Sequence, residues 1–254
     1  MMDKQTLQEK VLKARTQRLM NNCYSMESAD HCTRIWSGED GFLYSWEDHG
    51  VQRLTFFVND WKALDGLLEQ VDGGSYYLEF LTKDPRENIP AGARQVAAMM
   101  RLANSDCRSV FEKDSPILRY FDPDIGEPAT VHDISEINQL LWNTFHTEIS
   151  HLLTDGELAR KAGQLTIHRE AQKIDAILQA EVLPKKFYIN QIINRGDRKN
   201  IHAMLLNRLK EYIEADGKYL YAWVENQNIA SQKFHQKYGM KHDGMWNVLF
   251  AVEK

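Results

Sequence analysis

The sequence predicts an α+β fold in which a mixed β-sheet is flanked by helices. One observation is that apolar residues recur at helical spacing over residues 201–213, directly before a strand-like run at 218–224. Another is that three strand-like runs precede this helix, which is typical of an antiparallel meander. The predicted strands cover residues 165–169, 173–182, 187–194, 218–224 and 245–252, and the predicted helices cover 133–145, 157–162, 201–213 and 229–238.

Residues at the element boundaries support these predictions. Asp133 is placed to cap the N-terminus of helix 133–145, and Pro184 marks a turn between two strands. Gly217 and Gly239 each follow a predicted helix, where a left-handed residue commonly ends the helix. The second half of the chain is therefore predicted as helix, three strands, helix, strand, helix, strand.

Composition narrows the classes of function and partner. The chain has 254 residues, of which 43% are hydrophobic, and a formal net charge of -5. Because this charge does not attract phosphate backbones, we expect no nucleic-acid partner. Apolar runs fall far short of the roughly 20 residues of a membrane span, so we expect no membrane partner. Three cysteines without CxxC spacing predict free thiols and a cytoplasmic location, and the histidines lack metal-ligand spacing, so we expect no metal.

A proline-rich segment predicts a division of the chain. Residues 111–128 contain three prolines, acidic residues and a glycine without sustained periodicity. We therefore expect an N-terminal α/β domain at 1–115, a linker at 116–128 and a second domain at 129–254. Near the start, Leu7 and Val11 predict an amphipathic helix that packs on the body, with binding to a membrane surface as the alternative.

The first half echoes part of the second. A strand at 52–58, a helix at 61–71 and a strand at 75–81 repeat the order of elements over residues 187–224. The first copy has almost no loop between strand and helix, whereas residues 195–200 form a basic loop in the second. The echo indicates either an internal repeat with a degenerate first copy or a chance similarity of two strand-helix-strand units.

The basic loop is a candidate phosphate site. A strand that leads through a loop into a helix presents unpaired N–H groups and a positive dipole end to an anion. Arg195, Arg198 and Lys199 add positive side chains at this place. A solvated basic turn is the alternative interpretation.

At this point the sequence resembles the GNAT superfamily of acetyl-CoA-dependent N-acetyltransferases. The family places Q/R-x-x-G-x-G/A between a strand and a helix, and later an Asn-led helix that ends in Gly and a large apolar residue. Residues 224–231 continue through 234–238 to Gly239 and Met240 in agreement with the later part. The glycine motif is degraded, because Asn200 and His202 stand where the two glycines would be.

The resemblance implies acetyl-CoA as cosubstrate and a GNAT-like twisted mixed sheet, in tandem with a degenerate N-terminal half. The pantetheine arm would lie along strand 187–194, the pyrophosphate over residues 198–202, and Asn228 near the pantetheine. His202 would restrict the approach of the pyrophosphate or contact it. The implied cofactor-binding residues are Ile192, Ile193, Arg198, Lys199, Asn200, Ile201, His202 and Asn228.

Amide formation from a thioester sets the remaining requirements. An alkyl amine with a pKa of about 10.4 is only about one part in 10³ neutral at pH 7, so a base or a desolvating pocket is needed. Glu181 is the first candidate base, with His168, His146 and Glu148 as others. His146 and Glu148 follow the helix that borders the acceptor site in this superfamily, so they are also candidate substrate residues.

Two further roles concern the oxyanion and the leaving thiolate. By resemblance, a main-chain N–H within residues 190–193 would meet the oxyanion. The family often has a Tyr that protonates the thiolate, and alignment on Gly239 puts His235 at that position. A surface histidine is the alternative interpretation of His235, and Tyr238 is a second possible donor whose place usually belongs to the core.

The sequence thus predicts an N-acetyltransferase that moves an acetyl group from acetyl-CoA to a primary amine of a small molecule or peptide. One alternative is a catalytically degenerate module that binds coenzyme A or acts through a partner. A second alternative is an aminoacyl-tRNA-dependent transferase, which the acidic balance of the chain does not favour.

Overall fold

The protein, seen in a computed structural model that describes residues 4–254, consists of two compact units. Unit 1 contains the residues up to Ala98 together with Thr147–His151 and Met245–Lys254, and unit 2 contains Met99–His146 and Leu152–Gly244. These units do not coincide with the boundaries expected at 115 and 129. The reason is that each unit includes residues from both halves of the chain.

Unit 1 is a mixed sheet with the strand order β2-β3-β4-β5-β12-β6. Strands β4 and β5 pair in parallel, while β2–β3, β3–β4 and β5–β12 pair antiparallel. The helices are α1 (Lys4–Thr16), α2 (Glu27–Asp30) and α3 (Trp61–Leu68). The strands are β1 (Met20–Asn21), β2 (Cys32–Gly38), β3 (Gly41–Asp48), β4 (Val51–Val58), β5 (Ser75–Thr82), the first part of β6 (Ala93–Asn104) and most of β12 (Lys241–Glu253).

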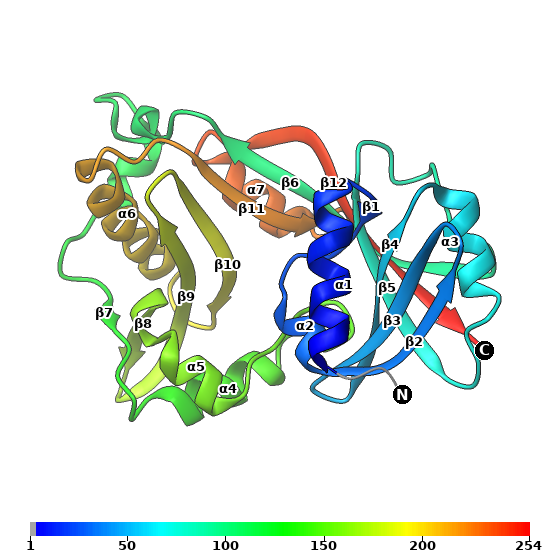
Figure 1. Ribbon diagram of the computed structural model, residues 1–254. Coiled ribbons are helices and arrows are strands. Elements are labelled where there is room, and N and C mark those ends of the chain that lie inside the picture. The colour runs from blue at the N-terminus through cyan, green and yellow to red at the C-terminus, as the bar shows by residue number, and fades with distance from the viewer. Residues whose placement is uncertain (1–3) are drawn as a thin grey trace. The chain divides into compact units, whose positions relative to one another are not determined.

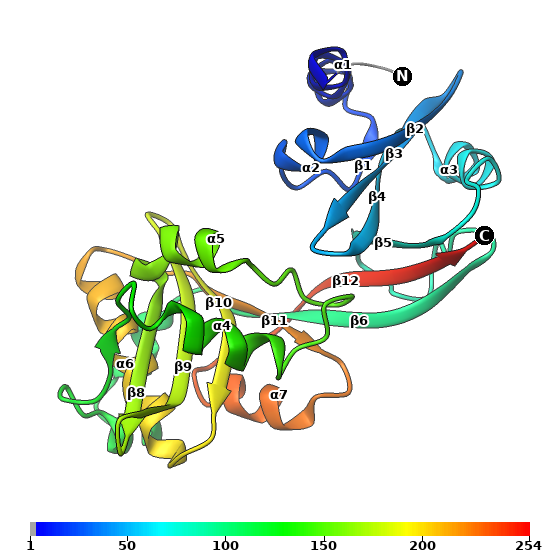
Figure 2. The same cartoon turned by 90° about the horizontal axis from the view of Figure 1, so that it is seen from below.

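The sheet of unit 1 buries apolar side chains on both faces. Helix α1 lies on one face and α3 on the other, as Figure 2 shows. The predicted N-terminal helix is confirmed in α1, whose Leu7 and Val11 are buried against Phe42 and Tyr44 of β3. The face of α1 that carries these residues therefore packs on the unit.

Unit 2 is a second mixed sheet, with the order β6-β11-β10-β9-β8-β7. Strands β10 and β11 pair in parallel, and the other pairs are antiparallel. The strands are β7 (Glu127–Pro128), β8 (Leu165–Glu170), β9 (Lys173–Leu183), β10 (Lys186–Asn194) and β11 (Leu220–Glu225). The helices are α4 (Ile134–Trp142), α5 (Asp155–Arg160), α6 (Arg198–Glu214) and α7 (Ile229–Gln236), with the 3₁₀ helices η1 (Cys107–Phe111), η2 (Pro116–Tyr120) and η3 (Ala162–Gln164).

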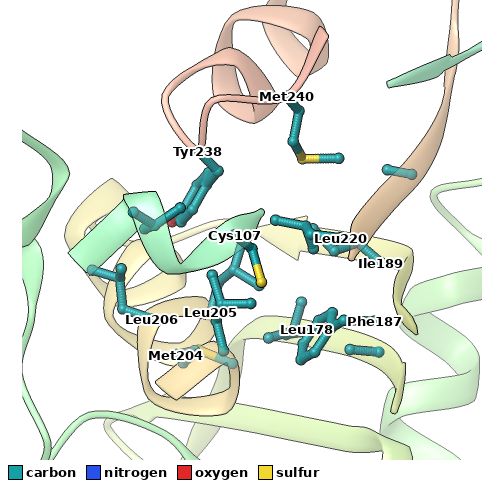
Figure 3. Packing of buried hydrophobic residues seen from close by; sticks show 14 of the residues in the cluster. Cys107, Leu178, Phe187, Ile189, Met204, Leu205, Leu206, Leu220, Tyr238 and Met240 are labelled. Atoms are coloured by element: carbon teal, nitrogen blue, oxygen red, sulfur yellow. The ribbon is translucent and has the colours of Figure 1, made fainter. Parts of the chain in front are cut away.

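Helix α6 is the centre of the larger core of unit 2 and lies along β8–β10 (Figure 1). Figure 3 shows Met204 and Leu205 of α6 directed at Leu178 and Phe187 of the sheet. A separate apolar cluster joins α4 and α5 to β8 and β9. The sheet is therefore covered by α6 on one face and by α4 and α5 on the other.

Each sheet is completed by a strand from the other half of the chain. In unit 1, residues 246–253 of β12 pair with β5, while in unit 2 residues 99–104 of β6 pair with β11. Without these strands, β5 and β11 would each lose one row of main-chain hydrogen bonds. The expected simple division into a first and a second domain misses this exchange.

The predicted mixed sheet flanked by helices is confirmed, and so are the predicted elements of the second half. The sequence analysis missed β2, β3 and β6 in the first half. In the segment expected as a linker, Ile117 of η2 is buried in the core of unit 2, and Phe121 and Ile125 pack against that core. The prolines therefore mark an irregular but packed segment.

Two expected helix ends differ in detail. Asp133 occupies the N-cap position of α4, yet its carboxylate accepts hydrogen bonds from Thr130 and Arg169 instead of from the helix. After α6, Asp216 and not Gly217 has the left-handed conformation, with a φ of 62°. Gly239 does adopt the predicted positive φ, at 70°.

Gly217 is required for a different reason, which gives a prediction. A Cβ at this position would lie 2.3 Å from the ring of Tyr212, which is buried. Gly217→Ala is expected to lower the free energy of unfolding by about 1–3 kcal/mol, because the ring must move within a packed core. Gly156→Ala is the control, since a Cβ there meets nothing within 4 Å. Urea unfolding would contradict the prediction if both variants were equally stable.

Candidate functional site

The parallel pairing of β10 with β11 is short. It joins Phe187 to Leu220, Tyr188 to Tyr221 and Ile189 to Ala222, and then ends. The register of β10 with β9 shifts between Ile189 and Gln191, so Asn190 lies at a bulge. Beyond this bulge β10 continues to Asn194 with β9 as its partner strand. The edge of β10 that faces away from β9 is therefore not paired with β11 over its last residues.

The turn that follows β10 leads into the N-terminus of α6. Asp197 is the N-cap, and its carboxylate accepts a 2.9 Å hydrogen bond from the N–H of Lys199. Arg195, Arg198 and Lys199 are exposed, and Lys199 Nζ lies 3.9 Å from the Asp197 carboxylate. The predicted basic residues are thus in place, but an acidic residue that the sequence analysis did not consider stands among them.

Asn200, which replaces the first glycine, lies beside His168 of β8. Its Nδ2 is 3.2 Å from Nδ1 of His168, and the same imidazole nitrogen is 2.6 Å from Asp175 Oδ1. The Asp175 carboxylate occupies the space of a Cβ at Gly196, since its Oδ2 would lie 1.9 Å from that atom. His168, predicted as a possible base, therefore contacts Asp175 and Asn200 and helps to hold this turn in place.

His202, which replaces the second glycine, points into the core. It is only 3% exposed, and its ring stacks between Tyr120 and Phe234 with centroids 4.8 and 4.7 Å away. Nδ1 shares a 2.8 Å hydrogen bond with the Tyr238 hydroxyl, which also donates to the His202 carbonyl at 3.4 Å. Burial, together with the charges of Lys237 and Arg119, lowers the pKa of His202 to about 4. The imidazole is thus neutral and does not fill the turn, so it cannot make the predicted contact with a pyrophosphate.

The turn fits an anionic diphosphate in part. In its favour, the side chains that replace both glycines are directed at His168 and the core, and three exposed cations surround the helix start. Against it, Asp197 already uses one of the N-terminal N–H groups and adds a negative charge. We therefore conclude that main-chain groups and flexible cations, and no imidazole, would hold such a ligand here.

His235 differs from its predicted role as a proton donor. It is 4% exposed, and its Nδ1 lies 2.8 Å from the carbonyl of Ser231, which can only accept. Burial lowers the pKa of His235 to about 4, although the bond to Ser231 opposes this. The ring is therefore neutral with its proton on Nδ1, and Nε2 is a buried lone pair without a hydrogen-bond partner among the described residues. An imidazole in this state can accept a hydrogen bond but has no proton on Nε2 to give.

Asn228 lies at the N-cap of α7, where its side-chain oxygen accepts a 3.0 Å hydrogen bond from the N–H of Ser231. The residue is exposed. Because the side-chain oxygen of Asn228 already accepts this hydrogen bond from the helix, a hydrogen bond to a ligand would come from the side-chain nitrogen. Tyr238, the second possible donor, is fully buried against His202 as expected of a core residue.

Ile192 and Ile193 of β10 lie beyond the bulge. Ile192 packs partly buried against the α6 side of the sheet, whereas Ile193 is buried with the α4 and α5 cluster. Ile201 of α6 is also buried. Only main-chain groups of these three residues can therefore meet a ligand through hydrogen bonds.

Glu181 lies on β9 opposite Tyr188 of β10. Tyr188 stacks on Tyr221 with centroids 4.7 Å apart, and burial and then the charge of Glu181 raise the pKa of Tyr221. Glu181 is half-buried, so it combines a carboxylate with an aromatic surface. It stands about 17 Å along the strand from Ala176, the partner of His168, so the two candidate bases do not belong to one site.

The two candidate acceptor residues fall in different units. His146 is an exposed residue of unit 2. Glu148 belongs to unit 1, where its main-chain oxygen accepts a 3.2 Å hydrogen bond from Arg53.

Comparisons with known proteins address the fold. A putative acetyltransferase from the GNAT family of Novosphingobium aromaticivorans has a TM-score of 0.54 at 13% identity, covering 90% of this chain and 93% of that one. The chain has the GNAT fold. A GCN5-related N-acetyltransferase from Sphaerobacter thermophilus gives a TM-score of 0.55 at 11% identity, with 84% and 76% covered.

A tandem GNAT protein from the clavulanic acid biosynthesis pathway also shares the GNAT fold, with a TM-score of 0.54 at 12% identity, covering 87% of this chain and 83% of that one. No family model and no curated protein matches the sequence. Within residues 4–254, no helix is both long and apolar enough to cross a membrane, and no group of metal-ligating side chains is found. All three cysteines are free thiols.

One cluster in unit 1 of this GNAT-fold chain escaped the sequence analysis. His151 Nδ1 lies 2.7 Å from Asp48 Oδ2, and its Nε2 lies 2.9 Å from Glu79 Oε1. Buried Arg53 donates to the same Asp48 oxygen at 2.6 Å, and Asn247 donates to Glu79. The partners are far apart in sequence, so no local motif could reveal the cluster.

The charges of this cluster support one another. Burial opposes ionisation, but the charge of Glu79 and hydrogen bonds to Asp48 and Glu79 raise the pKa of His151 to about 9. Against the same opposition, the hydrogen bond and charge of His151 and the neighbouring Arg53 lower the pKa of Asp48 to about 2. Imidazolium and carboxylates therefore coexist at neutral pH, and they hold the 147–151 segment on unit 1.

This cluster predicts a window of stability. Because its pKa is raised, His151 contributes fully to the unfolding free energy below the unfolded-state pKa of about 6.5, and this contribution is lost as pH rises through about 9. Because its pKa is lowered, Asp48 makes a contribution that is lost as pH falls toward 2. Wild type is expected to lose about 1–2 kcal/mol of unfolding free energy between pH 6 and 9.5, after allowing for the 42% exposure of the His151 side chain.

His151→Ala should remove most of that alkaline loss, and His31→Ala, at an exposed histidine of the same unit, should retain it. Urea unfolding at the two pH values measures the difference. Parallel pH profiles for wild type and His151→Ala would contradict the assignment.

Proposed function

We propose that this chain transfers an acetyl group from acetyl-CoA to a primary amine of a small molecule or peptide. The observation that carries the proposal is the early end of the β10–β11 pairing at a bulge, directly before the α6 N-terminus. This combination supplies a free strand edge and a helix start in one chain segment. The GNAT-fold neighbours described as acetyltransferases support the same reaction class.

The free edge of β10 is assigned to the acyl end of the ligand. Main-chain N–H groups that lack a strand partner can bind the amide groups of an extended arm and the oxyanion that forms during attack. The N–H groups within residues 190–193 that point away from β9 take this role, with each oxyanion donor worth about 3 kcal/mol. When bound, acetyl-CoA supplies the thioester on which the amine acts.

The start of α6 is assigned to the phosphates. Arg195, Arg198 and Lys199 are exposed cations around a helix N-terminus, whose dipole also favours an anion. Asn200, Ile201 and His202 contribute through the helix dipole alone, because their side chains are engaged elsewhere and the Asn200 N–H already bonds to the Asp197 carbonyl. Asn228 contributes its amide nitrogen from the start of α7.

Glu181 is assigned as the base that removes the proton from the amine. Its place beside the stacked pair Tyr188 and Tyr221 combines a proton acceptor with an apolar surface that disfavours the charged ammonium form. His235 is assigned as a neutral hydrogen-bond acceptor, since its Nε2 is a buried lone pair without a described partner. The proton that the leaving thiolate requires therefore comes from the amine or from water. His146 and Glu148 remain proposed acceptor residues.

We also propose that the chain is a tandem of two related halves, with 129–254 as the functional acyltransferase and 1–115 as a degenerate copy. In unit 1, α3 links the parallel strands β4 and β5, and in unit 2, α6 links the parallel strands β10 and β11. The exchange of the last strands between the halves then follows from the pairing of β12 with β5 and of β6 with β11.

A non-catalytic coenzyme A-binding module is the second candidate. Two observations favour it, namely the Asn and His at the glycine positions and the absence of a proton on Nε2 of His235. Release of free thiol from acetyl-CoA over a panel of primary amines separates the two functions. Turnover with any amine supports the transferase, whereas binding without turnover supports the module.

The phosphate assignment predicts the effect of charge reversal. Calorimetric titration of wild type with acetyl-CoA is expected to show binding, and Arg198→Glu is expected to weaken it at least tenfold, because a cation next to the phosphates becomes an anion. Lys210→Glu is the matched control, about 18 Å further along the same helix, and should bind as wild type does. Asn228→Asp keeps the helix cap and should weaken binding several-fold. Equal affinities of Arg198→Glu and Lys210→Glu would place the phosphates elsewhere.

Asp197 gives a prediction of opposite sign. Its carboxylate occupies an N–H of α6 and repels an anion. Asp197→Asn keeps an N-cap side chain but removes the charge, so acetyl-CoA should bind about 3–10-fold more tightly. The control is Glu214→Gln, the same loss of charge at the last residue of α6. Weaker binding by Asp197→Asn would mean that this carboxylate supports the ligand.

A further inference from the structure

In unit 1 the parallel pairing of β4 with β5 also ends early. It joins Arg53 to Tyr77 and Leu54 to Leu78, although β4 continues to Val58 and β5 to Thr82. The edge of β4 beyond Leu54 therefore corresponds to the edge of β10 beyond Ile189 in unit 2. In both units the first strand of the parallel pair extends beyond the last residue that pairs with its parallel neighbour.

The two edges differ in what pairs with them. In unit 1 the short strand β1 pairs antiparallel with this part of β4, Met20 opposite Val58 and Asn21 opposite Phe57. In unit 2 no strand of the described chain pairs with β10 on that side beyond Ile189. The edge is thus occupied by the protein's own chain in unit 1 and left open in unit 2.

Asn22 closes the point where β4 and β5 part. Its Nδ2 donates to the main-chain oxygens of Leu54 at 2.9 Å and Glu79 at 2.8 Å, one on each strand. Its Oδ1 accepts a 2.8 Å hydrogen bond from the N–H of Phe56. The residue is only 5% exposed, and both amide hydrogens and the oxygen are used. Removal of this carboxamide would leave three buried main-chain groups unpaired.

The start of α3 shows which ligand this place suits. Asp60 directly precedes the helix, and its carboxylate accepts a 2.9 Å hydrogen bond from the N–H of Ala63. No basic loop precedes this helix, in contrast to the turn of unit 2, although both helices have an Asp as N-cap. The surroundings therefore suit an uncharged extended chain with amide groups and not a phosphate.

We infer that unit 1 retains a slot for an extended amide-bearing chain and that residues 20–22 of the protein itself occupy it. The coenzyme therefore binds once per chain, in unit 2. The expected stoichiometry of one coenzyme per chain rests on the proposed function, whereas the closure of the slot in unit 1 does not. When the carboxamide of residue 22 is removed, the slot opens to neutral chains such as pantetheine.

The test uses the full chain, with Asn22→Ala and the control Asn21→Ala. Asn21 precedes it on the same segment but is exposed, and its side chain bonds only to nearby main-chain groups, the Leu19 oxygen and the Cys23 N–H. Amide exchange followed by NMR should show the Phe56 N–H exchanging at least tenfold faster in Asn22→Ala and unchanged in Asn21→Ala. Millimolar pantetheine should slow that exchange again in Asn22→Ala alone.

Two measurements on the wild-type protein test the inference without requiring that any variant folds. Two equivalents of bound coenzyme A per chain, or pantetheine-induced shifts at Phe56 and Val58 in wild type, would overturn the inference while leaving the transferase proposal intact. Absence of any coenzyme A binding would instead end the proposed function, and the exchange of Phe56 would still decide whether Asn22 closes unit 1. Undiminished protection of Phe56 in a folded Asn22→Ala variant would also overturn the inference.

Discussion

The structure of unit 2 depends on a parallel strand pair that is only three residues long. Parallel strands need a crossover, and α6 supplies it while its apolar residues fill the main core. The bulge at Asn190 then turns β10 away from β11, so that the strand keeps β9 as its partner but has a free edge. The free edge, the helix start and the turn between them are consequences of this one junction.

The same junction occurs in unit 1 with a different result. There the parting strands are bridged by Asn22, whose carboxamide satisfies main-chain groups on both of them. The edge that stays open in unit 2 is thus closed in unit 1 by the pairing of β1 with β4 and by one buried amide. This difference gives a physical meaning to the proposed degeneracy of the first half.

Much of unit 2 could be predicted, because its signals are local. The apolar spacing in α6, the alternation in β10 and the glycine after α7 each depend on neighbouring residues. Strand β6 could not be predicted in this way, since its Ala-Met-Leu composition suits a helix and only its pairing with β11 makes it a strand. The directions of His202 and His235 depend on burial and on residues distant in sequence, so residue type alone did not predict them. The partners of His151 are likewise distant in sequence, and no role was predicted for it.

The exchange of strands has a consequence for how the chain acquires its structure. The sheet of unit 1 is finished only by β12, whose residues from Met245 onward are synthesised after every residue of unit 2. Until then β5 exposes an unpaired edge beside a nascent second unit, the situation in which chaperones protect growing chains. Completion of the unit 1 sheet therefore follows the synthesis of all of unit 2, although most of unit 1 precedes unit 2 in the chain.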